Sequence, residues 1–139
     1  MAAHRNTAFR EQQMLDLAKN AILDSGDFLS LDQAAQRLGL APVNLDDWET
    51  EGKIFSIQHG GCSRFPMYAF LADEGHGPVP GLKVILDVLR TKKGGWGIAF
   101  WFASPSSHLG GSRPQNVLFS DADEVLLAAQ DEVAGITHG

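Results

Sequence analysis

The stretch of sequence that decides the fold is Trp101-Phe102-Ala103-Ser104-Pro105-Ser106-Ser107-His108-Leu109-Gly110-Gly111-Ser112-Arg113-Pro114. It begins with aromatic residues suited to the end of an apolar helix. It finishes with a proline suited to the first position of another helix. A Pro/Ser turn and a double glycine lie between them, and a backbone that turns sharply between two apolar helices favours positive φ angles. The stretch therefore predicts two packed helices joined by a tight loop.

Apolar residues at helical spacing lie on both sides of this loop. The segments 82–89 and 96–102 are predicted to form an amphipathic helix and a short, very apolar helix. After Pro114, Ser120 is expected to cap a final helix that Gly135 ends. The apolar face of that final helix is Val125, Leu126, Ala129 and Val133. Residues 82–139 are thus predicted to form a small helical domain.

The first third of the chain contains a predicted pair of helices joined by a glycine turn. A helix over residues 9–25 is expected to stop at Gly26. Ser30 and Gln33 form a capping-box pattern that opens a helix ending at Gly39. A third helix begins with Pro42 at its first position and runs to Gly52. This arrangement is typical of a helix–turn–helix unit.

A β-hairpin is predicted directly after the helix pair. Residues 54–59 alternate at period two, Gly60-Gly61 is a hairpin turn signal, and residues 62–65 supply the return strand. Pro66 is expected to end the pairing because proline has no N–H to offer. The fold class is therefore mainly α with a small β-hairpin. It consists of a winged helix–turn–helix head (1–74), a linker (75–81) and a small C-terminal helical domain (82–139).

The composition is that of a soluble cytoplasmic protein. Hydrophobic residues make up 44% of the 139 residues, and no apolar run approaches the roughly 18 residues that span a bilayer. The start has no apolar signal stretch, and one cysteine, Cys62, cannot form an internal disulfide. We therefore expect a cytoplasmic protein with no membrane association. The net charge of −6 is unevenly distributed: residues 29–76 carry −4, residues 77–119 carry +4, and residues 120–139 hold five acids with no Lys or Arg.

Residues 82–139 resemble the toxin-binding domain of bacterial Xre/MbcA/ParS-type antitoxins. The resemblance rests on Trp101, Pro105, Leu109-Gly110-Gly111, Arg113-Pro114 and Asp123-Glu124-Val125-Leu126. It implies that this domain binds and silences a partner toxin, typically one that consumes NAD. Large apolar residues at helical spacing usually build a core, so Trp101, Leu109 and Pro114 are expected to do that. The head is similar to the MerR-like winged-helix group, and its hairpin differs from the all-helical head of plain Xre antitoxins.

The head supplies the candidate DNA-binding residues. The second helix of the pair carries four carboxylates up to Glu51 and no basic residue, whereas a helix in the major groove normally brings cations to phosphates and bases. The leading interpretation is a DNA-binding transcriptional regulator or antitoxin. The alternative is a protein–protein adaptor whose head does not bind DNA. The candidate DNA contacts are Arg37, Asn44, Thr50, Lys53, Ser63 and Arg64.

The tail domain supplies the candidate partner surface. The final helix presents an acidic outer face, which predicts a salt-sensitive encounter with a partner of complementary charge. A homodimer is also expected, because the tail holds more large apolar groups, between Trp96 and Phe102, than so small a domain easily buries. No catalytic constellation, metal site or cofactor motif is recognised, so the chain is not expected to be an enzyme. The candidate partner contacts are Leu109, Gly110, Gly111, Arg113, Asp131 and Glu132.

Overall fold

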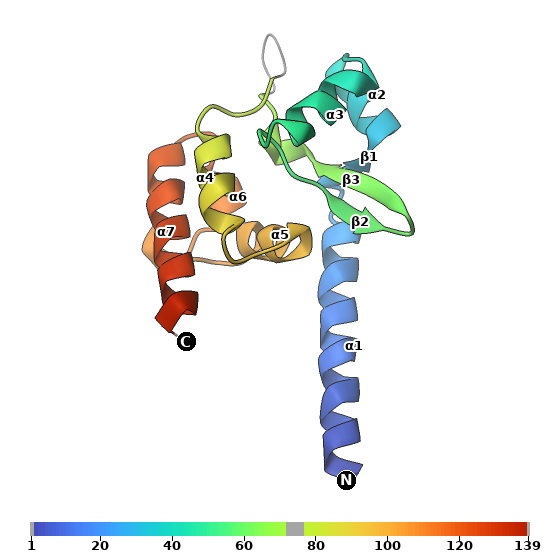
Figure 1. Cartoon of the computed structure of the whole chain (residues 1–139), viewed down its shortest axis with the longest axis vertical. Helices are drawn as coiled ribbons and strands as arrows, with labels where there is room; N and C mark the ends of the chain where they lie inside the picture. Colours follow the sequence, from blue (N-terminus) through green and yellow to red (C-terminus); the bar gives the residue numbers. More distant parts are fainter. Residues whose placement is uncertain (1, 72–76, 139) are drawn as a thin grey trace.

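The structure is a computed structural model that describes residues 2–71 and 77–138, with side chains described from Thr7 to Ile136 within those ranges. The described chain is mainly helical and carries one small three-stranded antiparallel sheet, which confirms the predicted fold class at this level (Figure 1). The helices and strands are, in chain order, α1 (Ala2–Asp24), β1 (Phe28–Ser30), α2 (Leu31–Leu38), α3 (Pro42–Thr50), β2 (Ile57–His59), β3 (Cys62–Pro66), α4 (Leu82–Leu89), α5 (Gly95–Ala103), α6 (Pro114–Val117) and α7 (Ala122–His138). Short 3-10 turns lie at Met67–Ala69 and Ser107–Leu109.

The sheet joins the predicted hairpin to a third strand that was not predicted. β2 and β3 pair around Gly60 and Gly61, whose positive φ angles of 60° and 78° suit a tight hairpin turn. β1 pairs with the other edge of β3, so that β3 is the central strand. The hairpin pairing stops at the Ile57–Arg64 pair, before Pro66, and Pro66 is the last residue of β3, so the prediction that Pro66 ends this pairing is confirmed. On the other edge of β3, Pro66 still lies in register with Phe28 of β1. The missing proline N–H is tolerated there, since the next residue donates instead: Met67 N lies 2.7 Å from the carbonyl oxygen of Asp27.

The predicted caps of the helix pair are confirmed. The hydroxyl of Ser30 accepts from the backbone N–H of Gln33, and the Gln33 side chain accepts from the backbone N–H of Ser30, both at 3.3 Å. Gly39 ends α2 in the left-handed conformation with φ 68°, and Pro42 opens α3 at its first turn. The two helices therefore contact each other across a sharp, glycine-dependent turn.

Two details of the final helix differ from the prediction. The carboxylate of Asp121 accepts from the backbone N–H of Glu124 at 3.2 Å, so Asp121 and not Ser120 caps α7. The Ser120 hydroxyl instead donates to the Val117 carbonyl oxygen. Gly135 lies inside α7 and does not end it, because one glycine costs a long helix only about 1 kcal/mol. The predicted apolar face is confirmed: Val125 and Ala129 are fully buried, and Leu126 and Val133 are half-buried.

The first helix is longer than predicted and extends away from the rest of the molecule. α1 begins at Ala2 instead of Phe9, and Gly26 stops it with φ 83° as expected. Figure 1 shows its N-terminal part projecting from the body, while its last turns reach the sheet. Among the described residues, no helix combines the length and apolar character that crossing a bilayer requires.

Residues on both sides of the predicted linker share one hydrophobic core. Phe102 in α5 is fully buried and stacks on Phe55 of the head, with ring centroids 5.9 Å apart. The guanidinium of Arg90, just after α4, donates to the carbonyl oxygens of Gly52 and Ile54, each at 2.9 Å. The division at 75–81 stays a prediction, and residues 75 and 76 lie outside the described part. The tail is in any case packed firmly against the head.

Candidate DNA-binding and partner surfaces

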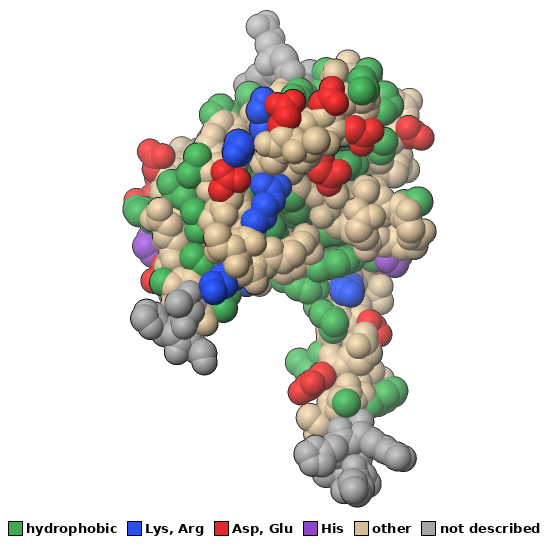
Figure 2. Space-filling model, in the orientation of Figure 1, with side chains coloured by type: hydrophobic (Ala, Val, Ile, Leu, Met, Phe, Trp, Pro, Cys, Tyr) green, Lys and Arg blue, Asp and Glu red, His purple; other side chains and the backbone are tan. Residues whose placement is uncertain are grey.

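The outward face of α3 is acidic. Asp46 and Asp47 are exposed, while Leu45 is fully buried on the opposite side of the helix. Glu49 is half-buried and accepts a hydrogen bond from the Ser56 hydroxyl. Figure 2 shows acidic side chains spread over α2 and α3. Carboxylates repel phosphate, so α3 by itself offers no attraction to a DNA backbone.

The three candidate cations of the head differ in how available they are. Arg37 is exposed in the last turn of α2 and has no ion pair with another described residue. Lys53 pairs with Glu51 at 2.8 Å, which neutralises part of its charge. Arg64 is half-buried in the central strand, and its Nε is buried with no hydrogen-bond partner in the described part of the chain. Arg37 is therefore the cation that phosphate can reach most easily.

The polar candidates are partly engaged within the chain. Asn44 is half-buried in the first turn of α3, and the Thr50 hydroxyl donates to the Asp46 carbonyl oxygen at 2.9 Å. Ser63 accepts from the amide of Gln58 at 2.8 Å across the hairpin. Ser63 also lines a hollow beside the start of α2, whereas Arg37 lies at the end of that helix. The candidates thus belong to one head but do not form one continuous patch.

The predicted loop after Trp101 has the expected tight geometry. Gly110 and Gly111 adopt φ angles of 66° and 90°, which confirms the need for positive φ. The loop closes on itself, since the N–H of Gly111 donates to the Ser106 carbonyl oxygen at 2.8 Å. Trp101 and Pro114 are buried, and Leu109 packs half-buried against the core. These residues build the domain, as predicted.

The candidate partner residues fall into two separate places. Asp131 and Glu132 of α7 line a groove of about 210 Å³ together with the loop residues 104–108. Glu132 also pairs with Lys93 at 3.2 Å. The prediction that Glu132 lies on an acidic outer face of the final helix is corrected by this ion pair, because the turn after α4 brings Lys93 against α7. Asp131 is the exposed carboxylate of the groove.

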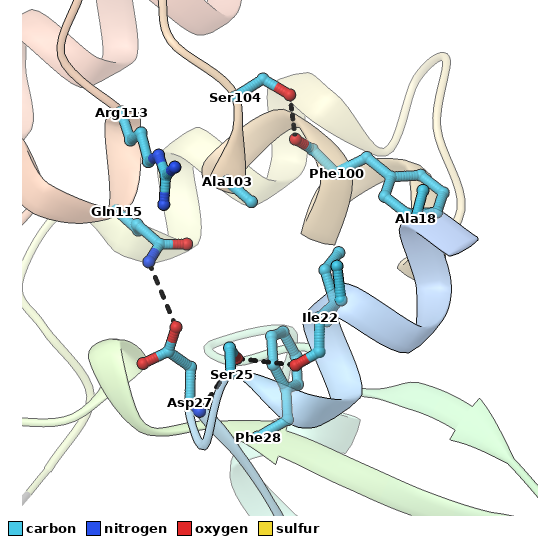
Figure 3. Close-up of a pocket in the computed structure, with 11 residues that line it drawn as sticks. Ala18, Ile22, Ser25, Asp27, Phe28, Phe100, Ala103, Ser104, Arg113 and Gln115 are labelled. Carbon is cyan, nitrogen blue, oxygen red and sulfur yellow. Dashed lines mark hydrogen bonds between the residues drawn. The ribbon is translucent and has the colours of Figure 1, made fainter. Parts of the chain in front are cut away.

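Arg113 lies at a second cavity that the sequence does not reveal. This cavity measures about 270 Å³ and lies between the end of α1, the start of β1, α5 and α6 (Figure 3). Its walls are mostly apolar, with Ile22, Phe28 and Phe100 among them. At one end, Arg113 and Gln115 face Asp27, and the Gln115 amide donates to the Asp27 carboxylate at 3.3 Å.

No local sequence signal marks this second cavity. Its lining comes from two stretches, residues 18–28 and 100–115, that are far apart in the sequence. Only Arg113 attracts notice in the sequence, because it stands between the double glycine and the helix-opening proline. The cavity exists because α5 and α6 dock on the end of α1.

Tyr68 is a half-buried tyrosine at the junction of head and tail, and its titratable hydroxyl is buried. Its ring lies 5.3 Å from that of Phe102, and its hydroxyl is buried without a hydrogen-bond partner among the described residues. Burial raises the pKa of Tyr68 well above its ordinary value, and the nearby charge of Asp27 raises it further. The folded chain therefore holds the phenol proton more tightly than the unfolded chain does.

We expect stability to fall above pH 10 because of Tyr68. Below pH 10, which is about the pKa of tyrosine in the unfolded chain, Tyr68 is protonated in both states and does not change the stability. As the pH rises from about 10 toward the higher pKa of the folded state, the unfolded chain loses its phenol proton first and stability is lost. The chain contains a single tyrosine, so ultraviolet absorbance of tyrosinate reports this residue alone. Tyrosinate should appear only as the protein unfolds. Tyr68→Phe removes an unpaired buried hydroxyl and should leave stability at pH 7 equal or higher while flattening its alkaline decline. Ionisation near pH 10 in the folded protein would contradict this prediction.

The described chain belongs to the mainly helical class of folds with one small three-stranded antiparallel sheet, in the order β1-β3-β2. No family model and no curated protein matches the sequence. Among solved structures, the chain is similar to the NMR structure of Rv2175c, with a TM-score of 0.61 and 23% sequence identity. The match covers 76% of this chain and 80% of Rv2175c. At this identity the similarity establishes a common fold.

Proposed function

We propose that the chain is a cytoplasmic transcriptional regulator of the antitoxin kind, which binds DNA with its head and a protein partner with its tail. The observation that supports DNA binding is the order of helices and strands in the head. A helix and a strand precede the helix pair α2–α3, and a β-hairpin follows it. Winged helix–turn–helix heads use this order to place the second helix of the pair and the hairpin on one side of the molecule. The hairpin tip at Gly60 and Gly61 is exposed, as a wing must be.

The proposal that the protein binds a protein partner rests on the tail. Its resemblance to the toxin-binding domain of antitoxins supports a protein partner, and an NAD-consuming toxin is the partner which that resemblance favours. The groove at Asp131 offers a negative rim beside the Ser/Pro loop, so it suits a partner with basic side chains. Glu132 contributes less to this rim, because Lys93 balances its charge.

The acidic face of α3 favours a second candidate function. With Asp46, Asp47 and Glu51 exposed and Lys53 paired, the head has few free cations for phosphate. Under this alternative the protein is an adaptor that binds proteins with both halves. Duplex binding by the wild type decides between the two functions.

The test uses one variant in each half, so that each variant serves as the control for the other. We expect the wild type to retard a duplex selected from genomic fragments at low salt. Arg37→Ala should weaken binding to every sequence and lower the slope of affinity against salt by about one charge. Asp131→Lys should leave DNA binding unchanged and should weaken binding to the partner, taken as an NAD-consuming product of a neighbouring reading frame.

The outcomes separate the proposals. A duplex affinity that Arg37→Ala does not change would remove α2 from the DNA surface. If the wild type binds no fragment at low salt, the adaptor function replaces the regulator function. If Asp131→Lys remains folded and still neutralises the toxin as the wild type does, α7 is not the partner surface.

A further inference from the structure

The outer face of α1 carries large apolar side chains that no described residue covers. Phe9 and Leu17 expose 64% and 69% of their surface. Figure 1 shows α1 projecting from the body, and Figure 2 shows apolar side chains along its free part. Contacts with the body come from the last turns, where Ile22 is buried and Lys19 lies 5.2 Å from the ring of Trp96.

A further partner would stabilise the free part of α1. Most helical stability in proteins comes from packing of one face, and Phe9 and Leu17 on this part of the helix remain exposed. The aromatic residues of the tail, on which the expectation of a dimer rests, do not supply that partner, since Phe102 is buried against the head. The exposed apolar groups of the free helix are the better candidates for an interface.

The side chains of the outer face are arranged symmetrically about Gln13. Phe9 and Leu17 lie four residues to either side, and Arg10 and Asp16 lie three residues to either side. Positions at this spacing fall on one face of a helix. A shallow groove runs along it, lined by Arg10, Gln13, Met14, Asp16, Leu17 and Asn20. Along the helix, the order of these side chains is therefore apolar, basic, polar, acidic and apolar, and it is the same from either end except that the two charges exchange sign.

We propose that α1 pairs antiparallel with α1 of a second copy of this chain, with the two-fold axis at Gln13. In this arrangement Phe9 comes level with the partner's Leu17, and Arg10 comes level with the partner's Asp16. A two-fold interface requires such self-complementarity, because the same patch is used on both subunits. A parallel pair would instead bring Arg10 beside its own copy. This proposal does not depend on DNA or toxin binding by the other surfaces.

Charge favours a second copy over a phosphate or a lipid surface. Residues 2–24 hold three basic and three acidic residues, so the helix has no net charge. A helix that binds phosphates or anionic lipid carries an excess of Lys and Arg, which α1 lacks.

Sedimentation equilibrium of the full chain tests the interface. The wild type should be a dimer at micromolar concentration, and Leu17→Glu should raise the dimer dissociation constant by more than about tenfold, since it places a carboxylate against the partner's Phe9. Phe119→Glu is the matched control: Phe119 is 67% exposed outside α1, and its replacement should leave the dimer intact. Circular dichroism checks that both variants are folded. A monomeric wild type, or equal effects of the two substitutions, would overturn the proposal.

Cysteine cross-linking tests the orientation. Cys62 is exposed and is first replaced by Ser. With a rise of about 1.5 Å per residue, antiparallel pairing brings position 9 level with position 17 and separates the two copies of position 9 by roughly 12 Å. Chains carrying Phe9→Cys and Leu17→Cys should therefore form a mixed disulfide when combined and little disulfide when each is oxidised alone. Preferential pairing of each variant with itself would exclude the antiparallel arrangement.

Discussion

Phe102→Ala is expected to lower the free energy of unfolding by about 3–5 kcal/mol. Phe102 is fully buried, and its ring contacts Phe55 and Tyr68 of the head, at centroid distances of 5.9 and 5.3 Å. The substitution removes the buried area and leaves a cavity that packed aromatic neighbours cannot easily fill. Small domains have a total stability of about 5–15 kcal/mol, so the loss is a large part of the whole.

The way in which Phe102→Ala unfolds is as informative as the size of the loss. Trp48 lies in the head and Trp96 and Trp101 lie in the tail, so tryptophan fluorescence together with circular dichroism follows both halves in urea. Because one core joins the halves, we expect a single transition with a lower midpoint. Phe119→Ala, at an exposed position, should change stability by no more than about 0.5 kcal/mol. A loss below about 1 kcal/mol, or a transition of the tail alone, would show that the ring does not join the halves.

Gly95→Ala is expected to destabilise the protein by about 1–3 kcal/mol or more, although alanine favours helices over glycine by about 1 kcal/mol. A Cβ at Gly95 would lie 2.4 Å from the backbone oxygen of Ser56, a distance that real Cβ atoms essentially never show. The first turn of α5 would have to move away from the segment before β2. That shift would strain the hydrogen bond from the Trp96 indole to the Gln58 carbonyl oxygen, which is 3.0 Å long.

Gly94→Ala is the matched control for the substitution at Gly95. Gly94 is the adjacent residue, has a φ of −89° and would have no atom within 4 Å of an added Cβ. It should therefore change stability by no more than about 0.5 kcal/mol. Urea unfolding of both variants measures the difference. Equal stability of the two variants would mean that α5 does not approach the head as closely as the structure places it.

The local elements could be predicted because their signals are local. The capping box at Ser30, the left-handed turn at Gly39, the hairpin turn at Gly60 and the positive φ angles at Gly110 depend on residues within a few positions of one another. The amphipathic spacing of residues 82–89 likewise identifies a helix and its buried face. In each case backbone geometry and side-chain chemistry act over one or two turns of the chain.

Strand β1 was beyond this kind of inference. Phe28–Ser30 is three residues long, and it becomes a strand only because β3, more than thirty residues later, presents a free edge to it. A segment this short has no period to detect, so its hydrogen-bond partners decide its conformation. The same pairing explains why Pro66 can remain in the sheet.

The sequence by itself determined the helix boundaries near strong caps, the hairpin, the tight loop between α5 and α6, and the segregation of charge along the chain. Only the tertiary structure decided which charged groups are free. Arg90 binds the head, Lys93 pairs with Glu132, Arg64 is half-buried in the sheet, and Arg37 remains open to solvent. Charge can be counted from sequence, but its availability depends on packing between distant elements. For the same reason, only the folded chain reveals that α5 closes the core of the head, while the described residues leave the outer face of α1 uncovered.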